Sequence, residues 1–334
     1  MEIERFVSEG MSPPAEFAAV RGIAELPVEP LARGVAFLVA STAGRPVARL
    51  SLHLCEDLVS APGRSGLIGH YEALSRAAGI ALLGAACREL AEQGALRVLG
   101  PMNGNTWARY RLALPSRPSD AVCEPPHFVS EPRNPFAYLE HFEQAGFRVC
   151  ARYESRLDDL ARDASDAGEV AERAAQAGFS LRTLDLEHFE PELTLLHALS
   201  LESFSDNLYY SPIGEDAFRA MYEPLRSRLD PEFVLIALDR ARHACGYLFA
   251  LADPLCVRDG RPWRLIAKTV AVSPSARGHG LANHMLDRVR AAARDRGFRE
   301  VIHALMHASN VSTRMSARFA ADVFRRYALW EWTP

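Results

Sequence analysis

The feature that most constrains this sequence is an internal repeat with a period of about 200 residues. Each copy has a predicted β-hairpin, at residues 34–54 and 232–251, followed by another apolar strand and then by Arg-x-x-Gly-x-Ala at the start of an amphipathic helix. A near-constant offset between matching landmarks indicates a duplicated domain. The landmarks are Arg76 and Arg277, Gly94 and Gly297, and Gly44 and His243, at offsets of 201, 203 and 199 residues.

The duplication predicts two domains. A chain of 334 residues with 49% hydrophobic residues can bury a core in each of them. We expect the first domain over residues 1–155, a charged, alanine-rich linker with a short helix over 156–178, and the second domain over 179–334. The proline-rich segment 115–135 predicts a long loop over one face of the first domain, near the cleft.

Composition excludes several classes of partner. The formal net charge of -4 and the isoelectric point near 6.3 argue against binding to nucleic acids or anionic membranes, which require a basic face. The N-terminal residues lack a signal-peptide pattern, and no apolar run approaches the roughly 18 residues of a membrane span, so we expect a cytoplasmic protein. The cysteines form no Cys-x-x-Cys pair and no zinc-like cluster, so neither disulfides nor a metal site are predicted.

A glycine-rich turn opens the helix of the second copy. Its glycines permit backbone conformations in which successive amides turn inward, and the helix start adds the positive end of its dipole. The turn therefore predicts a cradle for an anion such as a pyrophosphate. The stretch reads Val272-Ser-Pro-Ser-Ala-Arg277-Gly278-His279-Gly280-Leu281-Ala282.

Two common pyrophosphate sites do not fit these residues. A nucleotide P-loop requires a glycine directly before its lysine, but Lys268 follows Ala267, and Pro262 stands where the first glycine should be. The dinucleotide fingerprint fails at its third position, where the chain has Asn283. The hairpin ahead of the turn also argues against a dinucleotide-binding domain.

The turn, placed after a strand that ends in Val-x-Pro, resembles the acyl-CoA loop of the GNAT acyltransferase superfamily. The resemblance covers residues 179–334, and in the first copy Arg76-Ala-Ala-Gly79-Ile-Ala81 keeps the pattern without the second glycine or the Val-x-Pro. It implies an α/β (α+β) protein of two GNAT-like domains, each a mixed, mostly antiparallel sheet flanked by helices. The first copy would then be a degenerate domain that serves as scaffold and as a wall of the acceptor pocket.

The resemblance also implies which residues hold the acyl-CoA. The backbone of the strand 264–272 would bind the pantetheine arm where the fourth and fifth strands separate, and the loop amides would bind the pyrophosphate. The helix start after the fifth strand would serve for capping or for contact with CoA. The expected cofactor-binding residues are Val270, Val272, Arg277, Gly278, His279, Gly280, Leu281, Ala282 and Asn310.

The usual catalytic residues of that family are missing here. No aspartate or glutamate lies in 264–272, and Ala317 stands where a tyrosine usually falls on the last helix. Lys268 lies close to the usual acidic position and is the only lysine among 38 lysine and arginine residues. A compact ammonium group there would hold a carboxylate on the acceptor or offset charge on the thioester. On a regular strand its side chain shares one face with Ile266, Val270 and Val272.

His303 and His307 are the other candidates for catalysis. In the expected fifth strand they would lie on one face, roughly 13 Å apart, which is too far to share a metal ion. One of them would relay a proton, since imidazole titrates near neutral pH. A hydrogen-bonded histidine in the core is the alternative interpretation for each.

The sequence thus predicts an N-acyltransferase that uses acetyl-CoA or another acyl-CoA. It would transfer the acyl group directly to a small-molecule amine in a ternary complex, as a monomer or homodimer, without nucleic acid or membrane partners. A non-catalytic acyl-CoA sensor remains an alternative because the usual catalytic residues are absent. Aminoacyl transfer from tRNA, known from other tandem GNAT-like enzymes, is a third hypothesis that the acidic balance disfavours.

Overall fold

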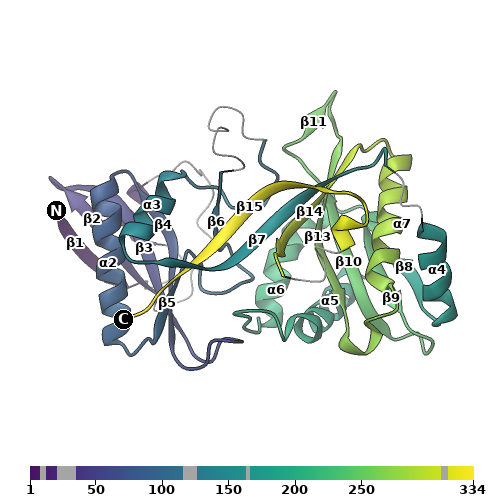
Figure 1. The fold of residues 1–334 in the computed structure, drawn as a ribbon, viewed down its shortest axis with the longest axis horizontal. Helices are drawn as coiled ribbons and strands as arrows, with labels where there is room; N and C mark the ends of the chain where they lie inside the picture. The colour runs from purple at the N-terminus through teal and green to yellow at the C-terminus, as the bar shows by residue number, and fades with distance from the viewer. Residues whose placement is uncertain (8–12, 21–34, 116–125, 163–165, 310–314) are drawn as a thin grey trace.

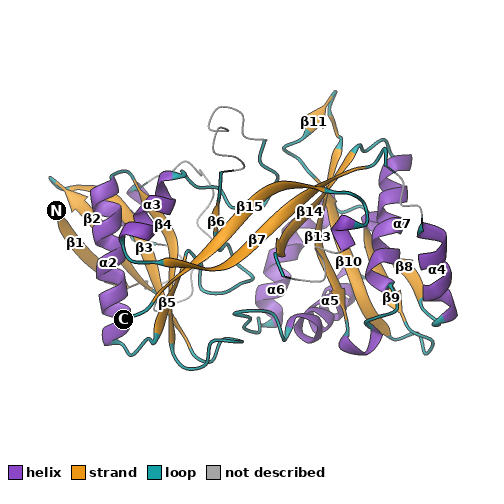
Figure 2. Ribbon diagram, in the orientation of Figure 1, coloured by secondary structure: helices purple, strands orange, loops and turns teal. Residues whose placement is uncertain are grey.

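The structure is a computed structural model that describes residues 1–7, 13–20, 35–115, 126–162, 166–309 and 315–334. The chain forms two halves, each with strands flanked by helices, and long strands cross between them (Figure 1, Figure 2). We refer to residues 1–162 as the first half and to residues 166–334 as the second half.

The first half contains the first predicted hairpin and helix. Ser75 caps that helix, since its Oγ accepts a hydrogen bond from the amide of Ala78 at 3.5 Å. The strands are β1 (Glu2–Val7), β2 (Ala36–Thr42), β3 (Arg45–Cys55), β4 (Ser65–Ala73), β5 (Arg97–Gly100), β6 (Leu112–Ala113) and β7 (Arg148–Asp159). The helices are α1 (Ala15–Ala19), α2 (Arg76–Glu92) and α3 (Ala137–Gln144).

The second half repeats the order of hairpin, strand, turn and helix, as predicted. Its helices are α4 (Ala167–Gln176), α5 (Phe189–Phe204), α6 (Glu215–Tyr222) and α7 (Leu281–Asp295), with short 3-10 helices at Glu223–Arg228, Pro231–Phe233 and Pro274–Ala276. Its strands are β8 (Ser180–Thr183), β9 (Val234–Leu238), β10 (Ala244–Ala252), β11 (Val257–Arg258), β12 (Arg261–Pro262), β13 (Arg264–Val272), β14 (Glu300–His307) and β15 (Asp322–Trp332).

Most strands join in one continuous mixed sheet, whose order is β1-β2-β3-β4-β5-β15-β7-β14-β13-β10-β9-β8, with β6 beside β15. The two predicted hairpins, β2–β3 and β9–β10, are antiparallel. In each half the strand before the helix pairs in parallel with the strand that follows the helix, β4 with β5 and β13 with β14. The predicted architecture, two units of mixed, mostly antiparallel sheet flanked by helices, is confirmed.

Helices bury both faces of the second half of the sheet. α7 packs Met285 and Val289 against Leu265 of β13 on one face. α5 packs Leu193 against Ile236 of β9 on the opposite face. The strand β13 is therefore central in its sheet and covered from both sides.

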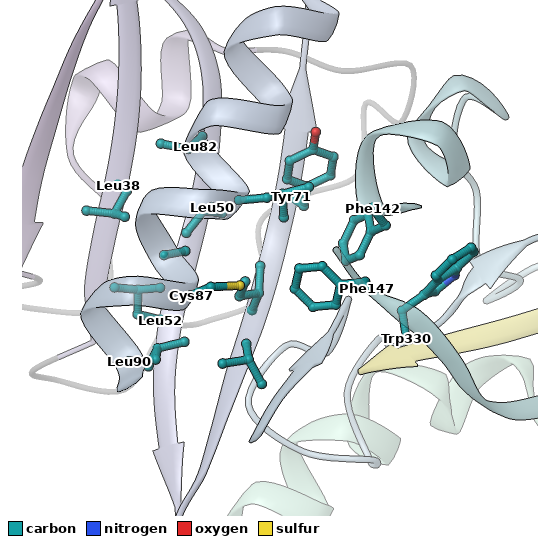
Figure 3. Packing of buried hydrophobic residues seen from close by; sticks show 14 of the residues in the cluster. Leu38, Leu50, Leu52, Tyr71, Leu82, Cys87, Leu90, Phe142, Phe147 and Trp330 are labelled. Atoms are coloured by element: carbon teal, nitrogen blue, oxygen red, sulfur yellow. The ribbon is translucent and has the colours of Figure 1, made fainter. Parts of the chain in front are cut away.

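The last strands of the two halves are exchanged between them. β7, from the first half, pairs with β14 of the second, and β15, the last strand of the chain, pairs with β5 of the first. Figure 3 shows this exchange in the hydrophobic core of the first half, where Trp330 of β15 lies beside Phe142 of α3. The centroids of the two rings are 6.3 Å apart. The division into domains at residues 155 and 179 remains a prediction, but β7 extends to Asp159 and packs within the second half.

A buried ion pair fastens the exchanged strand β7 to the second half. Asp158 of β7 is fully buried and accepts hydrogen bonds from Nε and Nη2 of Arg290 on α7, at 2.7 and 3.1 Å. Nε2 of His303 on β14 lies 3.4 Å from the same carboxylate. Burial acts to raise the pKa of Asp158, but the contacts with His303 and Arg290 outweigh it and hold the pKa below its usual value.

We therefore expect Arg290→Gln to destabilise the fold strongly, because it leaves the carboxylate of Asp158 buried without its cation. Breaking a buried pair in this way costs about 3–5 kcal/mol of unfolding free energy. Urea unfolding at pH 7 measures the loss, and adding Asp158→Asn to the same variant should recover part of it. A loss below about 1 kcal/mol would show that the pair contributes no more than a surface ion pair.

Candidate functional site

Two parallel strands of the second half separate partway along their length. β13 and β14 pair from Arg264 with Glu300 to Ala267 with His303. Beyond this point no pairing joins Lys268–Val272 to β14 among the described residues. The separation lies where the sequence predicted an opening between the fourth and fifth strands.

A cavity of about 820 Å³ opens at this separation. Both halves of the chain line it, so its walls depend on the exchanged arrangement of the sheet. The second half contributes Phe204, Tyr222, Tyr247, Lys268, Thr269, Val270, His303, Leu305 and His307, among others. The first half contributes Trp107, Arg109, Tyr110, Arg111, Tyr153 and, from the end of the proline-rich loop, Phe128, Val129, Ser130 and Pro132.

Lys268 lies at an irregularity in β13. Successive residues Phe249 and Ala250 of β10 pair with Thr269 and Ala267, so Lys268 is the extra residue of a β-bulge. The bulge reverses the alternation of side chains, and the prediction that Lys268 shares one face with Ile266, Val270 and Val272 is therefore wrong. Val270 and Val272 pack on the side of α7, whereas Ile266 belongs to a cluster on the opposite side.

The ammonium group of Lys268 has an aromatic neighbour rather than a carboxylate. Nζ donates a hydrogen bond to the hydroxyl of Tyr222 at 3.4 Å and lies 4.9 Å from the centroid of its ring. The ring stabilises the cation without neutralising it. Among the described residues, Lys268 forms no ion pair.

The two histidines of β14 do not share a face, contrary to the prediction. His303 pairs with Arg156 and His307 with Tyr153 on β7, with an irregularity between His303 and Met306. Arg156 and Tyr153 are three residues apart on β7 and therefore point to opposite faces. Leu305, within the irregularity, has a φ of 56°, which is uncommon for a residue with a side chain.

His303 has the environment of a structural residue. Only 2% of it is exposed; Nδ1 is hydrogen-bonded to Oγ of Ser316 at 2.8 Å, and Nε2 faces Asp158. These contacts fit the alternative interpretation of a hydrogen-bonded core histidine.

His307 lies at the cavity and can take up a proton. Its Nδ1 is 2.8 Å from Oγ of Ser309, and its ring lies edge-on to that of Tyr153. Burial, and then the positive charge of Arg111, lower its pKa below the usual value. Its imidazole is therefore neutral at pH 7, the state that a proton acceptor requires.

The predicted anion cradle has the expected backbone. Gly278 and Gly280 have φ values of 88° and 76°, a region that favours glycine, and Gly280 is the N-cap of α7. No side chain of the described residues caps this helix, so the amides of its first turn remain available. A Cβ built on Gly278 would meet no atom within 4 Å, so the space before the loop is open. These features fit a pyrophosphate.

The other predicted contact residues serve the loop in different ways. Arg277 braces it, since Nε donates to the carbonyl of Val272 at 3.2 Å and Nη2 to that of Ser203 at 2.9 Å. His279 is exposed, with its ring 5.6 Å from that of Phe179. Val270 lines the cavity, and Leu281 and Ala282 form the first turn of α7. Asn310 lies outside the described residues.

The matching place in the first half is closed by its own chain. Past Leu67, the backbone of β4 pairs with the residues after β5: the amide of Met102 donates to the carbonyl of Ile68 at 2.7 Å, and the amide of His70 to Oδ1 of Asn103 at 2.8 Å. At the start of α2, a Cβ on Gly79 would lie 2.3 Å from the hydroxyl of Tyr71. Among the described residues of the first half, no edge or cradle comparable to that of the second half remains.

Sequence reasoning did not single out Arg111, Tyr153 and Tyr222. In the sequence, Tyr153 and Tyr222 have the pattern of ordinary apolar positions in a strand and a helix. Only the fold brings them to the cavity. The alternation of basic and aromatic residues in Trp107-Ala-Arg-Tyr-Arg111 was the one available signal.

The described residues contain no group of three or more histidine, cysteine, aspartate or glutamate side chains placed to bind a metal ion. None of the described helices combines the length and the apolar character that crossing a bilayer requires.

Comparisons with known proteins agree with this geometry. Residues 196–319 match the model of the acetyltransferase (GNAT) family. No curated protein sequence matches the chain significantly.

Solved structures with the same fold extend the likeness to the whole chain. A tandem GNAT protein from the clavulanic acid biosynthesis pathway has a TM-score of 0.52 and 14% identity, over 99% of this chain and 98% of that one. A GCN5-related N-acetyltransferase from Sphaerobacter thermophilus has a TM-score of 0.50 and 18% identity, over 91% and 82%. A fungal multi-domain GH3 β-N-acetylglucosaminidase with a GCN5-related glucosamine N-acetyltransferase region has a TM-score of 0.55 and 14% identity; the match covers 89% of this chain but only 33% of that one.

The effect of Arg111 on the pKa of His307 can be tested by titration. Arg111→Gln removes a positive charge that disfavours the imidazolium, so the pKa of His307 should rise toward its usual value while burial still holds it lower. An NMR titration of the histidine ring protons measures this pKa, with the His307→Gln spectrum assigning the signal. The exposed Arg45→Gln serves as control and should leave the pKa unchanged. An unchanged pKa in Arg111→Gln would show that Arg111 does not act on His307.

Proposed function

We propose that this chain, whose residues 196–319 form an acetyltransferase domain of the GNAT family, transfers an acyl group from acyl-CoA to a small-molecule amine. Acetyl-CoA is the proposed donor, and transfer is direct, within a complex of the enzyme with both substrates. The observation that carries the proposal is the separation of β13 and β14 after Ala267 and His303, which opens the cavity beside β13, the strand that the glycine-rich loop follows in the chain.

The second half supplies the groups that would hold the donor. The amides of Gly278–Ala282 face the pyrophosphate, and the backbone of β13 beyond Ala267 faces the pantetheine arm. Val270 is better placed than Val272 for this contact, because the carbonyl of Val272 already accepts a bond from Arg277. The acyl-CoA supplies the thioester whose carbonyl carbon is attacked.

The cavity side chains then divide the chemistry between them. The amine nitrogen forms a bond to the carbonyl carbon as the carbon–sulfur bond breaks, and the proton lost by nitrogen is the proton gained by the departing sulfur. His307 holds that proton between the two steps, because its imidazole is neutral and lies at the cavity. Lys268 offsets the negative charge that develops on the thioester oxygen and sulfur.

Binding of the donor should depend on the loop of the second half alone. Gly280→Pro removes an amide from the cradle and cannot keep the φ of 76°, so it should abolish CoA binding measured by calorimetry. The wild-type chain should bind one CoA, because the first half is closed at the equivalent place.

Gly297→Pro is the matched control. Gly297 follows the other end of α7, has a φ of 84° and likewise has open space around it, so the same change disturbs the same helix away from the cradle. It should leave CoA affinity within about twofold. Two CoA per chain, or unchanged affinity in a folded Gly280→Pro protein, would contradict the assignment of the donor site.

Catalysis should depend on a compact cation at residue 268. Lys268→Arg keeps the charge but puts a broader, planar group against Tyr222, and Lys268→Met keeps the stem without the charge. Both should bind CoA normally and lose about 100-fold in kcat, as when one group that stabilises developing charge is removed. Thiol release with an amine panel measures turnover. Wild-type turnover in Lys268→Arg would refute the role, whereas CoA binding by the wild type without turnover on any amine would support a sensor instead.

A further inference from the structure

Four arginines are buried among the described residues, and three of them face carboxylates. Arg264 lies 3.1 Å from Glu300, Arg290 lies 2.7 Å from Asp158, and Arg325 lies 2.6 Å from Glu131. The fourth, Arg111, is 7% exposed and has no carboxylate within 4.0 Å among the described residues. A buried cation without a counter-ion is costly, so the exception requires an explanation.

Arg111 is held rigidly at the cavity by contacts that leave its charge uncompensated. Its guanidinium lies between two aromatic rings, 3.8 Å from the centroid of Tyr110 and 4.0 Å from that of Tyr153. Nη1 donates to the carbonyl of Leu305 at 2.9 Å, while the buried Nε has no hydrogen-bond partner. The guanidinium is thus fixed in orientation, and its Nε edge donates no hydrogen bond within the described residues.

The backbone at this contact is strained on both sides. Arg111 has a φ of 75° and Leu305 a φ of 56°, in a region that residues with side chains rarely adopt. Arg111 comes from the first half and Leu305 from the irregularity in β14, so the contact also joins the two walls of the cavity. Strain of this kind persists where the surrounding structure enforces it, often at ligand sites.

The other charged groups around the cavity are also mostly cationic. Lys268 and Arg111 line it without an ion pair to any described residue, and Asp206, which is exposed, is the one carboxylate among the described residues of the lining. The field at His307 is consistent with this excess, since Arg111 contributes to the lowering of its pKa. The acceptor side of the cavity therefore favours a negative charge.

We propose that the amine acceptor carries a carboxylate, as an α-amino acid does, and that Arg111 binds this carboxylate through its free edge. The inference rests on the proposed function and specifies the substrate class of the same site. A carboxylate suits the site better than a phosphate, because the group available is one planar edge held between two tyrosine rings, which matches the two oxygens of a planar carboxylate. The first half thus selects the acceptor, while the second half binds the donor.

The test compares each amino acid with its amide, which keeps the shape and the amine but removes the negative charge. Wild-type enzyme, assayed by release of CoA thiol over the twenty amino acids and their amides, should favour an acid over its amide about tenfold to a hundredfold in kcat/KM. Arg111→Gln should remove most of this preference through KM. Arg111→Lys should keep part of it, because the charge remains but the planar edge is lost.

A binding measurement separates this inference from the proposed activity. With CoA present, the N-acetyl derivative of the preferred amino acid should bind wild type and not Arg111→Gln, whereas CoA alone should bind both equally. Arg111→Gln should also keep the wild-type melting temperature, in contrast to Arg290→Gln. Three results would overturn the inference. They are equal kcat/KM for amino acids and their amides, a preference for phosphoethanolamine, and an Arg111→Gln variant that loses kcat/KM equally for an amino acid and its amide. Failure of CoA to bind the wild type would overturn the proposed function, and this inference with it.

Discussion

The end of backbone pairing between β13 and β14 is the constraint on which the rest of the site depends. Up to Ala267 and His303 the two strands satisfy each other's amides and carbonyls, and beyond that point they leave an edge in the interior of the molecule. Buried backbone groups require partners, so an open edge at the centre of a sheet is stable only if another chain segment pairs with it or if water or a ligand occupies the space beside it. The first half shows the first outcome, with Met102 and Asn103 against β4, and the second half leaves room for the other.

The exchange of β7 and β15 makes the two halves parts of one site. Because β7 pairs with β14, residues of the first half such as Tyr153 and Arg111 come to lie opposite the separation of the strands in the second half. The first half, which is closed at the equivalent place in its own sheet, thus still furnishes walls for the cavity of the second half. The buried pair of Asp158 and Arg290 fastens β7 to α7, and His303, which lines the cavity, lies against the same carboxylate.

Local patterns made much of the fold predictable from sequence. The hairpins, the two matching helices and the left-handed glycines at 278 and 280 follow from apolar alternation, turn residues and the conformational freedom of glycine, all of which act over a few residues. The strand exchange was not predictable, because β7 has the same alternation whether it pairs within its own half or with β14. The bulges at Lys268 and near Leu305 carry no sequence signal either, and each reversed the expected faces.

The role of a charged side chain depends on what surrounds it, and this explains why the sequence indicated Lys268 as a candidate but not Arg111. A lone lysine can be counted in a sequence, whereas a buried arginine without a carboxylate is recognised only when the partners of the other buried arginines are known. Arg264, Arg290 and Arg325 each have a buried or half-buried carboxylate, so their charges are balanced within the fold. At Lys268 and Arg111 aromatic rings replace the carboxylate, and rings stabilise a cation while leaving its field directed into the cavity. A fold that balances its other buried arginines and leaves these two cations around one cavity is arranged to receive negative charge from outside. In our proposals this charge is that of the reacting thioester at Lys268 and that of the acceptor carboxylate at Arg111.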